Sequence, residues 1–187
     1  MVTVGVLALQ GGVKEHLQLL DTIGVAGVPV KTQSELSTID GLIIPGGEST
    51  TIAKLLTEFQ LQESVQSLIN SGIPVLGTCA GLILLSKEID SEPGYFDALS
   101  CSVERNAYGS QLASGEAAVR YDDKIEENAA FIRAPRIVQL VDSTPIAWVG
   151  DEIVAIKQGN VIGASYHPEL TNSTKLHRKL IELIKAD

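Results

Sequence analysis

The fold is decided by one stretch of the sequence, Ile73–Gly81 (IPVLGTCAG), and by the apolar run Leu82–Leu85 (LILL) that follows it. We predict a short strand that ends at Gly77 and a helix that begins just after Cys79. A Gly-x-Cys-x-Gly turn between a strand and a helix is typical of a nucleophile elbow, with cysteine in place of serine. A side chain at either glycine would crowd the neighbouring strand or helix. The turn would present the thiol in a cleft, where the N–H groups of the helix favour the thiolate.

Before this turn, strand-like and helix-like segments alternate along the chain. The predicted strands are Val2–Leu9, Val28–Lys31, Gly41–Ile44 and Ile73–Gly77, and the predicted helices are Val13–Ile23, Thr50–Phe59 and Gln62–Asn70. Nearly continuous apolar strands that alternate with amphipathic helices indicate an α/β fold, with a central, mostly parallel sheet flanked by helices. The loops at the ends of the four strands would then face one edge of the sheet.

The second half of the chain has a different sequence pattern, with short segments typical of antiparallel strands. These segments are Leu99–Glu104, Glu116–Tyr121, Ala129–Arg133, Ile137–Val141, Pro145–Val149, Glu152–Lys157 and Val161–Tyr166. Turn residues at Gly150-Asp151 and Gly159-Asn160 punctuate them. A closing helix is predicted over Thr174–Lys185. We see no internal repeat, low-complexity tract or linker, so residues 1–187 are predicted to form a single domain.

The composition excludes several classes of function. A formal net charge of −9 and a pI near 4.8 give nucleic-acid binding little electrostatic support. Two cysteines, Cys79 and Cys101, cannot build a disulfide framework or a four-thiolate metal site, and Cys101 is expected to be structural. The start of the chain has no basic leader, and no apolar run approaches the ~18 residues of a membrane span. We therefore expect a cytoplasmic protein with no membrane segment, metal or cofactor.

A cysteine in the core would also produce the elbow pattern, so a catalytic role needs a base and a group that orients the base. His16 and His177 lie in amphipathic helices among charged residues, and we expect ordinary surface roles for them. His167 follows a strand and precedes a proline, which favours an extended backbone. Residues two apart in extended chain point the same way, so Glu169 can reach the ring. A triad in the order Cys79, His167, Glu169 follows.

A glycine-rich loop follows the Gly41–Ile44 strand. At Gly46 and Gly47 backbone N–H groups can approach a ligand closely, as an oxyanion hole requires, and the N–H of Ala80 would be the second donor. The alternative is a turn in which Ser49 or Thr50 caps the next helix. A phosphate-binding loop is excluded because the Walker lysine pattern is missing.

Six segments together resemble the glutaminase subunits of pyridoxal 5'-phosphate synthases, a family of class I, triad-type glutamine amidotransferases. The segments are Leu9–Gly12 (LQGG), Pro45–Thr51 (PGGESTT), Gly77–Leu82 (GTCAGL), Val103–Asn106 (VERN), Phe131–Pro135 (FIRAP) and His167–Leu170 (HPEL). The elbow and the His-x-Glu pair are shared by all triad amidotransferases, whereas the PGGESTT, VERN and FIRAP segments resemble this subunit specifically. One departure is Ser110, which stands where the family usually has an arginine, before Gln111.

The resemblance implies a flavodoxin-like fold and hydrolysis of L-glutamine to glutamate and ammonia, through a glutamyl thioester. The ammonia would pass to a barrel-shaped synthase subunit that makes pyridoxal 5'-phosphate (vitamin B6). Cys79 would be the nucleophile, His167 the general base and acid, and Glu169 the orienting carboxylate. The residues that would hold glutamine are Gly47, Glu48, Ser49, Arg105, Ile132 and Arg133. Gln10 belongs to a segment that would couple the glutaminase to its partner.

Three alternatives stay open at this stage. The protein could be the glutaminase of another synthase, of the histidine or anthranilate type, which the VERN and FIRAP segments disfavour. It could be a non-catalytic regulatory binder on the same fold, which a complete triad disfavours. A cysteine peptidase is disfavoured because the charged side chains of Glu48, Arg105 and Arg133 suit a free amino acid better than a peptide.

Overall fold

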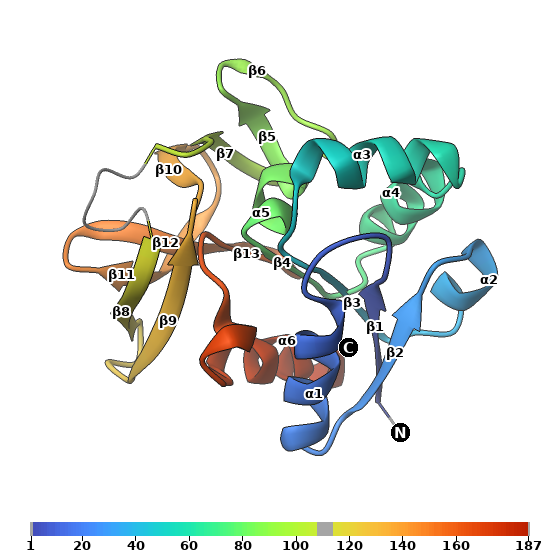
Figure 1. The fold of residues 1–187 in the computed structure, drawn as a ribbon, viewed down its shortest axis with the longest axis horizontal. Coiled ribbons are helices and arrows are strands. Elements are labelled where there is room, and N and C mark those ends of the chain that lie inside the picture. The colour runs from blue at the N-terminus through green and yellow to red at the C-terminus, as the bar shows by residue number, and fades with distance from the viewer. Residues whose placement is uncertain (1, 108–113, 187) are drawn as a thin grey trace.

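The computed structural model describes residues 2–107 and 114–186, and Ser110 and Gln111 lie outside them. Its main feature is a nine-stranded sheet in the order β2-β1-β3-β4-β13-β12-β11-β8-β9 (Figure 1). The strands are β1 (Thr3–Leu7), β2 (Ala26–Val30), β3 (Gly41–Ile44), β4 (Val75–Thr78), β8 (Ser114–Tyr121), β9 (Glu126–Ile132), β11 (Thr144–Val149), β12 (Glu152–Gln158) and β13 (Val161–Ala164). The strands from β2 to β13 in that order are parallel, and the other pairs are antiparallel.

The helices cover both faces of the sheet (Figure 1). They are α1 (Val13–Thr22), α2 (Gln33–Leu36), α3 (Ser49–Glu58), α4 (Gln62–Asn70), α5 (Ala80–Leu85) and α6 (Lys175–Ala186), with a 3-10 turn, η1 (Pro168–Leu170). Helices α1 and α6 pack on one face, and α3, α4 and α5 pack on the other. Successive side chains of a strand point to opposite faces of the sheet. On β3, Leu42 and Ile44 pack in the core beneath α3, α4 and α5, whereas Ile43 packs in the core beneath α1 and α6.

A second sheet of four strands lies beside α5, in the order β10-β7-β5-β6. Its strands are β5 (Ser86–Ile89), β6 (Glu92–Pro93), β7 (Leu99–Glu104) and β10 (Arg136–Leu140). The sequence did not predict β5, β6 or α2, because these segments are short and β5 exposes Lys87 and Glu88 at its centre. The helices and strands that the sequence did predict are all present. The bounds of β3, α4 and β7 are the predicted ones.

One strand from the second half of the chain belongs to the parallel half of the large sheet. We expected an antiparallel setting for Val161–Tyr166, but β13 pairs in parallel with β4 on one side and antiparallel with β12 on the other. Ala164 is in register with Thr78, and Gly77 with Ile44, so three parallel strands end side by side. The loops that follow β3, β4 and β13 are therefore neighbours, although they are far apart in the sequence.

Candidate active site

Cys79 occupies a strained turn between β4 and α5. Its backbone has φ 48° and ψ −102°, a conformation that non-glycine residues rarely adopt. A Cβ at Gly77 would lie 2.6 Å from the carbonyl carbon of Gly81, and a Cβ at Gly81 would lie 2.1 Å from the oxygen of Ile44. The steric reason predicted for the two glycines is thus confirmed. The Cys79 amide donates to the Ala164 oxygen at 2.8 Å, which ties the elbow to the end of β13.

The structure brings Cys79, His167 and Glu169 together. His167 Nδ1 lies 2.8 Å from Glu169 Oε1, and the Cys79 side chain hydrogen-bonds with the imidazole. Burial alone would lower the pKa of His167, but the hydrogen bonds to Cys79 and Glu169 outweigh it and raise the pKa to about 10. The ring therefore carries a proton at neutral pH, and it can give that proton to a departing group.

The other two histidines are buried next to Glu169 and to each other. We predicted surface roles for His16 and His177, and this was wrong, because both are fully buried. His16 Nδ1 lies 2.9 Å from His177 Nε2, and His16 Nε2 lies 3.1 Å from Thr78 Oγ1 and 3.4 Å from Glu169 Oε2. Helical spacing could have indicated burial, since His16 stands three and four residues before Leu19 and Leu20, on the face of α1 that packs on the sheet.

Burial keeps these two rings neutral. It lowers the pKa of His177 from 6.5 to about 3. Burial, together with the proximity of His177 and His167, lowers the pKa of His16 well below 6.5. Neither ring therefore competes with His167 for a proton at neutral pH.

We expect that none of the three histidines titrates between about pH 5 and pH 8, because His167 stays protonated and the other two stay neutral. The unfolded chain binds protons near pH 6.5, so the free energy of unfolding should fall below that pH by roughly 1 kcal/mol per pH unit for each buried neutral ring. His167 acts in the opposite sense: its contribution is complete below pH 6.5 and is lost as the pH rises towards 10. Imidazole NMR titration and urea unfolding at several pH values measure both effects.

The variant His177→Gln is the control for this prediction. It removes one buried ring that must stay neutral, so the loss of stability between about pH 6.5 and pH 5 should become shallower. A wild-type imidazole that titrates near pH 6.5 would contradict the prediction.

The glycine-rich loop after β3 is held in place from two directions. The Gly46 amide donates to Thr78 Oγ1 at 3.1 Å, and the Gly46 oxygen accepts from the Gly12 amide at 3.0 Å. A Cβ at Gly46 would lie 2.3 Å from His167 Cε1, so only glycine fits against the imidazole of His167. Because its amide is engaged, Gly46 does not offer a donor to an oxyanion in this structure, which corrects that part of the prediction. The amide of Gly47 has no acceptor among the described residues, and that of Ala80, the first residue of α5, has none within its helix.

Gln10 lies against the same loop. Its Oε1 accepts a hydrogen bond from the Glu48 amide at 2.8 Å, and a Cβ at Gly47 would come within 2.4 Å of that oxygen. The side chain of Gln10 thus sets the position of the loop through the backbone of Glu48.

Glu48 has a structural role besides the one predicted for it. It is the N-cap of α3, where Oε2 accepts from the Thr51 amide at 3.1 Å and from the hydroxyl of Thr50. These hydrogen bonds lower the pKa of Glu48. Neither Ser49 nor Thr50 is the cap, since Ser49 is buried as the first residue of the helix. The capping hydrogen bonds all fall on Oε2, so Oε1 can accept from a ligand.

A cavity of about 300 Å³ opens above Cys79. It is lined by the six residues predicted to hold a substrate and by five others: Gln10, Gly47, Glu48, Ser49, Cys79, Ile83, Arg105, Asn106, Ile132, Arg133 and His167. Cys79 and His167 lie at one part of its wall, and the carboxylate of Glu48 and the guanidinium groups of Arg105 and Arg133 supply charges of both signs. Such a lining suits a small zwitterion.

Asp90 is a residue that sequence reasoning missed. Its Oδ2 accepts from Arg105 Nε at 2.6 Å, and its Oδ1 accepts from the Arg105 amide at 2.8 Å. These hydrogen bonds lower the pKa of Asp90 and raise that of Arg105. Asp90 follows β5, and nothing in the local sequence indicated that β5 pairs with β7 and brings the two residues together. Asp90 fixes the direction in which Arg105 points.

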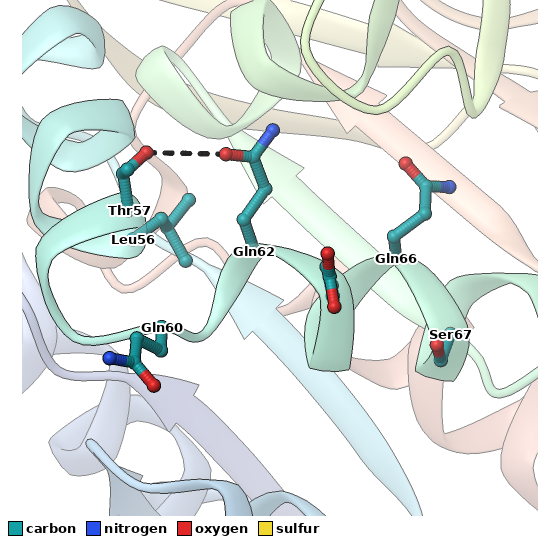
Figure 2. A pocket seen from close by; sticks show the side chains of 7 residues that line it. Leu56, Thr57, Gln60, Gln62, Gln66 and Ser67 are labelled. Carbon is teal, nitrogen blue, oxygen red and sulfur yellow. Dashed lines mark hydrogen bonds between the residues drawn. The ribbon is translucent and has the colours of Figure 1, made fainter.

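A second groove of about 780 Å³ runs between α3 and α4. Figure 2 shows that polar side chains line it, with Thr57 hydrogen-bonded to Gln62. It contains none of the predicted site residues. Among the described residues, no group of three or more His, Cys, Asp or Glu side chains could hold a metal ion. Within the same residues, no helix is long and apolar enough to cross a membrane.

Several known proteins are similar to this chain over nearly its whole length. The chain is 45% identical to the pyridoxal 5'-phosphate synthase subunit PdxT of Pyrococcus furiosus, over 98% of this chain and 100% of the relative. It is 44% identical to the protein of the same name from Staphylococcus haemolyticus, over 96% and 97%. A crystal structure of a glutamine amidotransferase matches with a TM-score of 0.91 and 40% identity, over 97% of this chain and 98% of that one.

The expected class I glutamine amidotransferase fold is confirmed by these matches. The structure of PurLQS from Thermotoga maritima shares the fold alone, with a TM-score of 0.74 and 14% identity over 96% of this chain and 97% of that one. The model of the SNO glutamine amidotransferase family matches residues 6–186. The chain belongs to the SNO glutamine amidotransferase family.

Proposed function

We propose that this protein is the glutaminase subunit of a pyridoxal 5'-phosphate synthase and hydrolyses L-glutamine to L-glutamate and ammonia. The observation that carries the proposal is the Cys79–His167–Glu169 constellation in a strained elbow, at the wall of a cavity with charges of both signs. Two relatives that are 45% and 44% identical to this chain over nearly their whole length are both named as pyridoxal 5'-phosphate synthase subunits, which supports the choice of synthase.

In the proposed mechanism, the Cys79 sulfur attacks the side-chain amide carbon of glutamine while His167 holds the thiol proton. The amide oxygen becomes an oxyanion, which the N–H groups of Gly47 and Ala80 stabilise. His167 gives its proton to the leaving nitrogen, so that ammonia departs and a glutamyl thioester remains. Water then attacks the thioester, His167 takes a proton from that water, and Cys79 is released with glutamate.

The same cavity explains why free glutamine would be preferred. Glu48 Oε1 suits the α-ammonium group, and the guanidinium of Arg105, held by Asp90, suits the α-carboxylate. Arg133 is a second cation at the rim, while Ser49 and the exposed side chain of Ile132 contact the rest of the substrate. In a longer peptide the α-amino and α-carboxyl groups are part of peptide bonds, so Glu48 and Arg105 would lose their charged partners.

The enzyme would work together with a second subunit. Ammonia would be delivered to a synthase subunit that docks near Gln10, because Gln10 holds the oxyanion loop through the Glu48 amide. We also propose that residues 1–187 form a single domain and that the protein acts in the cytoplasm, without a cofactor of its own.

We expect glutaminase activity that rises when the synthase subunit is added, because partner contact at Gln10 adjusts the position of Gly47. The test measures glutamate release with and without that subunit, with a Cys79→Ala glutaminase in the same mixture as the control. Glutaminase activity that responds only to the synthase of histidine or anthranilate formation would assign the protein to that rival. No glutamate in any mixture would favour a non-catalytic binder.

A further inference from the structure

We propose that His16 is a positioning residue for the glutaminase reaction: held by His177, it donates its Nε2–H towards the Glu169 carboxylate and joins the triad to the oxyanion loop through Thr78. The proposal rests on the proposed function, since it assigns a role within the same reaction. His16 touches none of the reacting atoms, because it lies below Glu169, outside the cavity.

The carboxylate of Glu169 needs a second donor. Its Oε1 lies 2.8 Å from His167 Nδ1, but Oε2 is buried and has no hydrogen-bond partner among the described residues. A buried carboxylate oxygen without a donor is costly. His16 Nε2 lies 3.4 Å from this oxygen without a hydrogen bond to it in the structure, where its hydrogen-bond contact is with Thr78 Oγ1 at 3.1 Å. Catalytic hydrogen bonds often tighten when the substrate is bound, so the same N–H can turn towards Oε2.

This requirement selects one tautomer for each buried ring. If His16 carries its proton on Nε2, its Nδ1 is an acceptor, and His177 Nε2–H donates to it across 2.9 Å. The remaining atom, His177 Nδ1, is then an acceptor without a donor, in agreement with its lack of a partner within the described part of the chain. The opposite arrangement would bury an unpaired N–H on His177 and turn a lone pair of His16 towards Glu169. The first arrangement is therefore favoured.

His16 also reaches the loop that would stabilise the oxyanion. Its Nε2 lies 3.1 Å from Thr78 Oγ1, which accepts the Gly46 amide at 3.1 Å. From the other side, the Gly12 amide at the start of α1 donates to the Gly46 oxygen at 3.0 Å, and the His16 amide donates to the Gly12 oxygen at 3.2 Å. The first turn of α1 thus holds Gly46 by its backbone and through the His16 ring.

The groups that face His16 explain why a neutral ring is used here. They are His177 of α6, Thr78 of β4 and Glu169 of η1, with His167 beyond the carboxylate. A charged ring at this point would pair with Glu169 and weaken its hold on the proton of His167. A neutral donor orients the carboxylate without adding a charge.

The first experiment replaces the donor. His16→Leu removes it from a buried position, and we expect kcat with the synthase subunit to fall about 10-fold or more, by analogy with the hydrogen bonds that orient metal-binding side chains, with KM within about 2-fold. His16→Gln carries an amide N–H and should recover most of the loss. Leu19→Ala, on the same buried face of α1, is the matched control for packing; it should lower the thermal midpoint and leave kcat unchanged.

The second experiment reads the tautomers directly in the wild-type protein. The chain has three histidines, so a long-range ¹H–¹⁵N spectrum of ¹⁵N-histidine-labelled protein resolves each ring. We expect protons on Nε2 of both His16 and His177. This measurement tests the proposed donor even if His16→Leu does not fold, and it needs neither the substrate nor the synthase subunit.

The outcomes separate this inference from the proposed function. A proton on His16 Nδ1, a wild-type kcat in His16→Leu, or a folded His16→Gln that recovers nothing would overturn the positioning role. A fall in kcat for Leu19→Ala equal to that for His16→Leu would reduce the effect to packing and overturn it too. If the wild-type protein releases no glutamate with the synthase subunit, the proposed function fails, whereas the Nε2 tautomers remain observable.

Discussion

Replacing Cys79 with alanine is expected to abolish glutaminase activity, with a loss on the order of 10⁴-fold or more. The reason is that Cys79 is the nucleophilic side chain that lies beside His167 at the wall of the cavity. The alanine keeps the Cβ and the backbone of the elbow, so the fold should survive. Glutamate release with the synthase subunit present and a thermal midpoint close to that of the wild type are the two measurements.

Cys101→Ala is the matched control. Cys101 is buried in β7, where burial raises the pKa of its thiol and Ser86 Oγ lies 3.4 Å away. It lies outside the cavity. Its replacement should leave activity unchanged, and mass spectrometry after brief iodoacetamide treatment should find the label on Cys79 alone. Wild-type activity in Cys79→Ala would refute the assignment of the nucleophile.

Replacing Glu169 with glutamine is expected to lower kcat by roughly 10²- to 10⁴-fold, as with the matching carboxylate of serine protease triads. Glu169 accepts from His167 Nδ1 at 2.8 Å and helps to raise the pKa of that ring to about 10. With a neutral amide in its place, the pKa of His167 should fall and the ring should lose its fixed orientation. Steady-state kinetics and an NMR titration of His167 report the two effects separately.

Glu152→Gln is the control for this variant. Glu152 pairs with Arg136 at 2.7 Å and lies outside the cavity, so its neutralisation should affect neither kcat nor the pKa of His167. An unchanged kcat in Glu169→Gln, or a His167 pKa that stays near 10, would show that the carboxylate does not orient the ring.

Local sequence was sufficient for most of the elements. Three elements have the predicted bounds: the strand Gly41–Ile44, the helix Gln62–Asn70 and the strand Leu99–Glu104. In each of them the apolar residues follow the pattern that is typical of that type of element. The elbow at Cys79 was also readable, since two glycines around a nucleophile meet a steric need within five residues. The missed strand Ser86–Ile89 has no such pattern and depends on its pairing with β7.

The errors concern groups whose partners come from distant parts of the chain. Charged neighbours in the sequence predict surface positions for His16 and His177, but both rings are buried. His16 Nδ1 lies 2.9 Å from His177 Nε2, although 161 positions separate the two residues. The Gly46 amide was expected to face a ligand, but it donates to Thr78, 32 residues away. Asp90, which holds Arg105, has no signal in its local sequence.

By itself, the sequence determined the α/β class, the elbow at Cys79 and the contact between His167 and Glu169, because spacings of a few residues dictate these features. Only the tertiary structure decided that β13 lies in parallel beside β4 and so delivers His167 to Cys79. It also decided that α1 and α6 bury two neutral histidines behind Glu169. The physical reason is that hydrogen-bond partners and burial are set by the packing of whole helices on the sheet, which no short stretch of sequence contains.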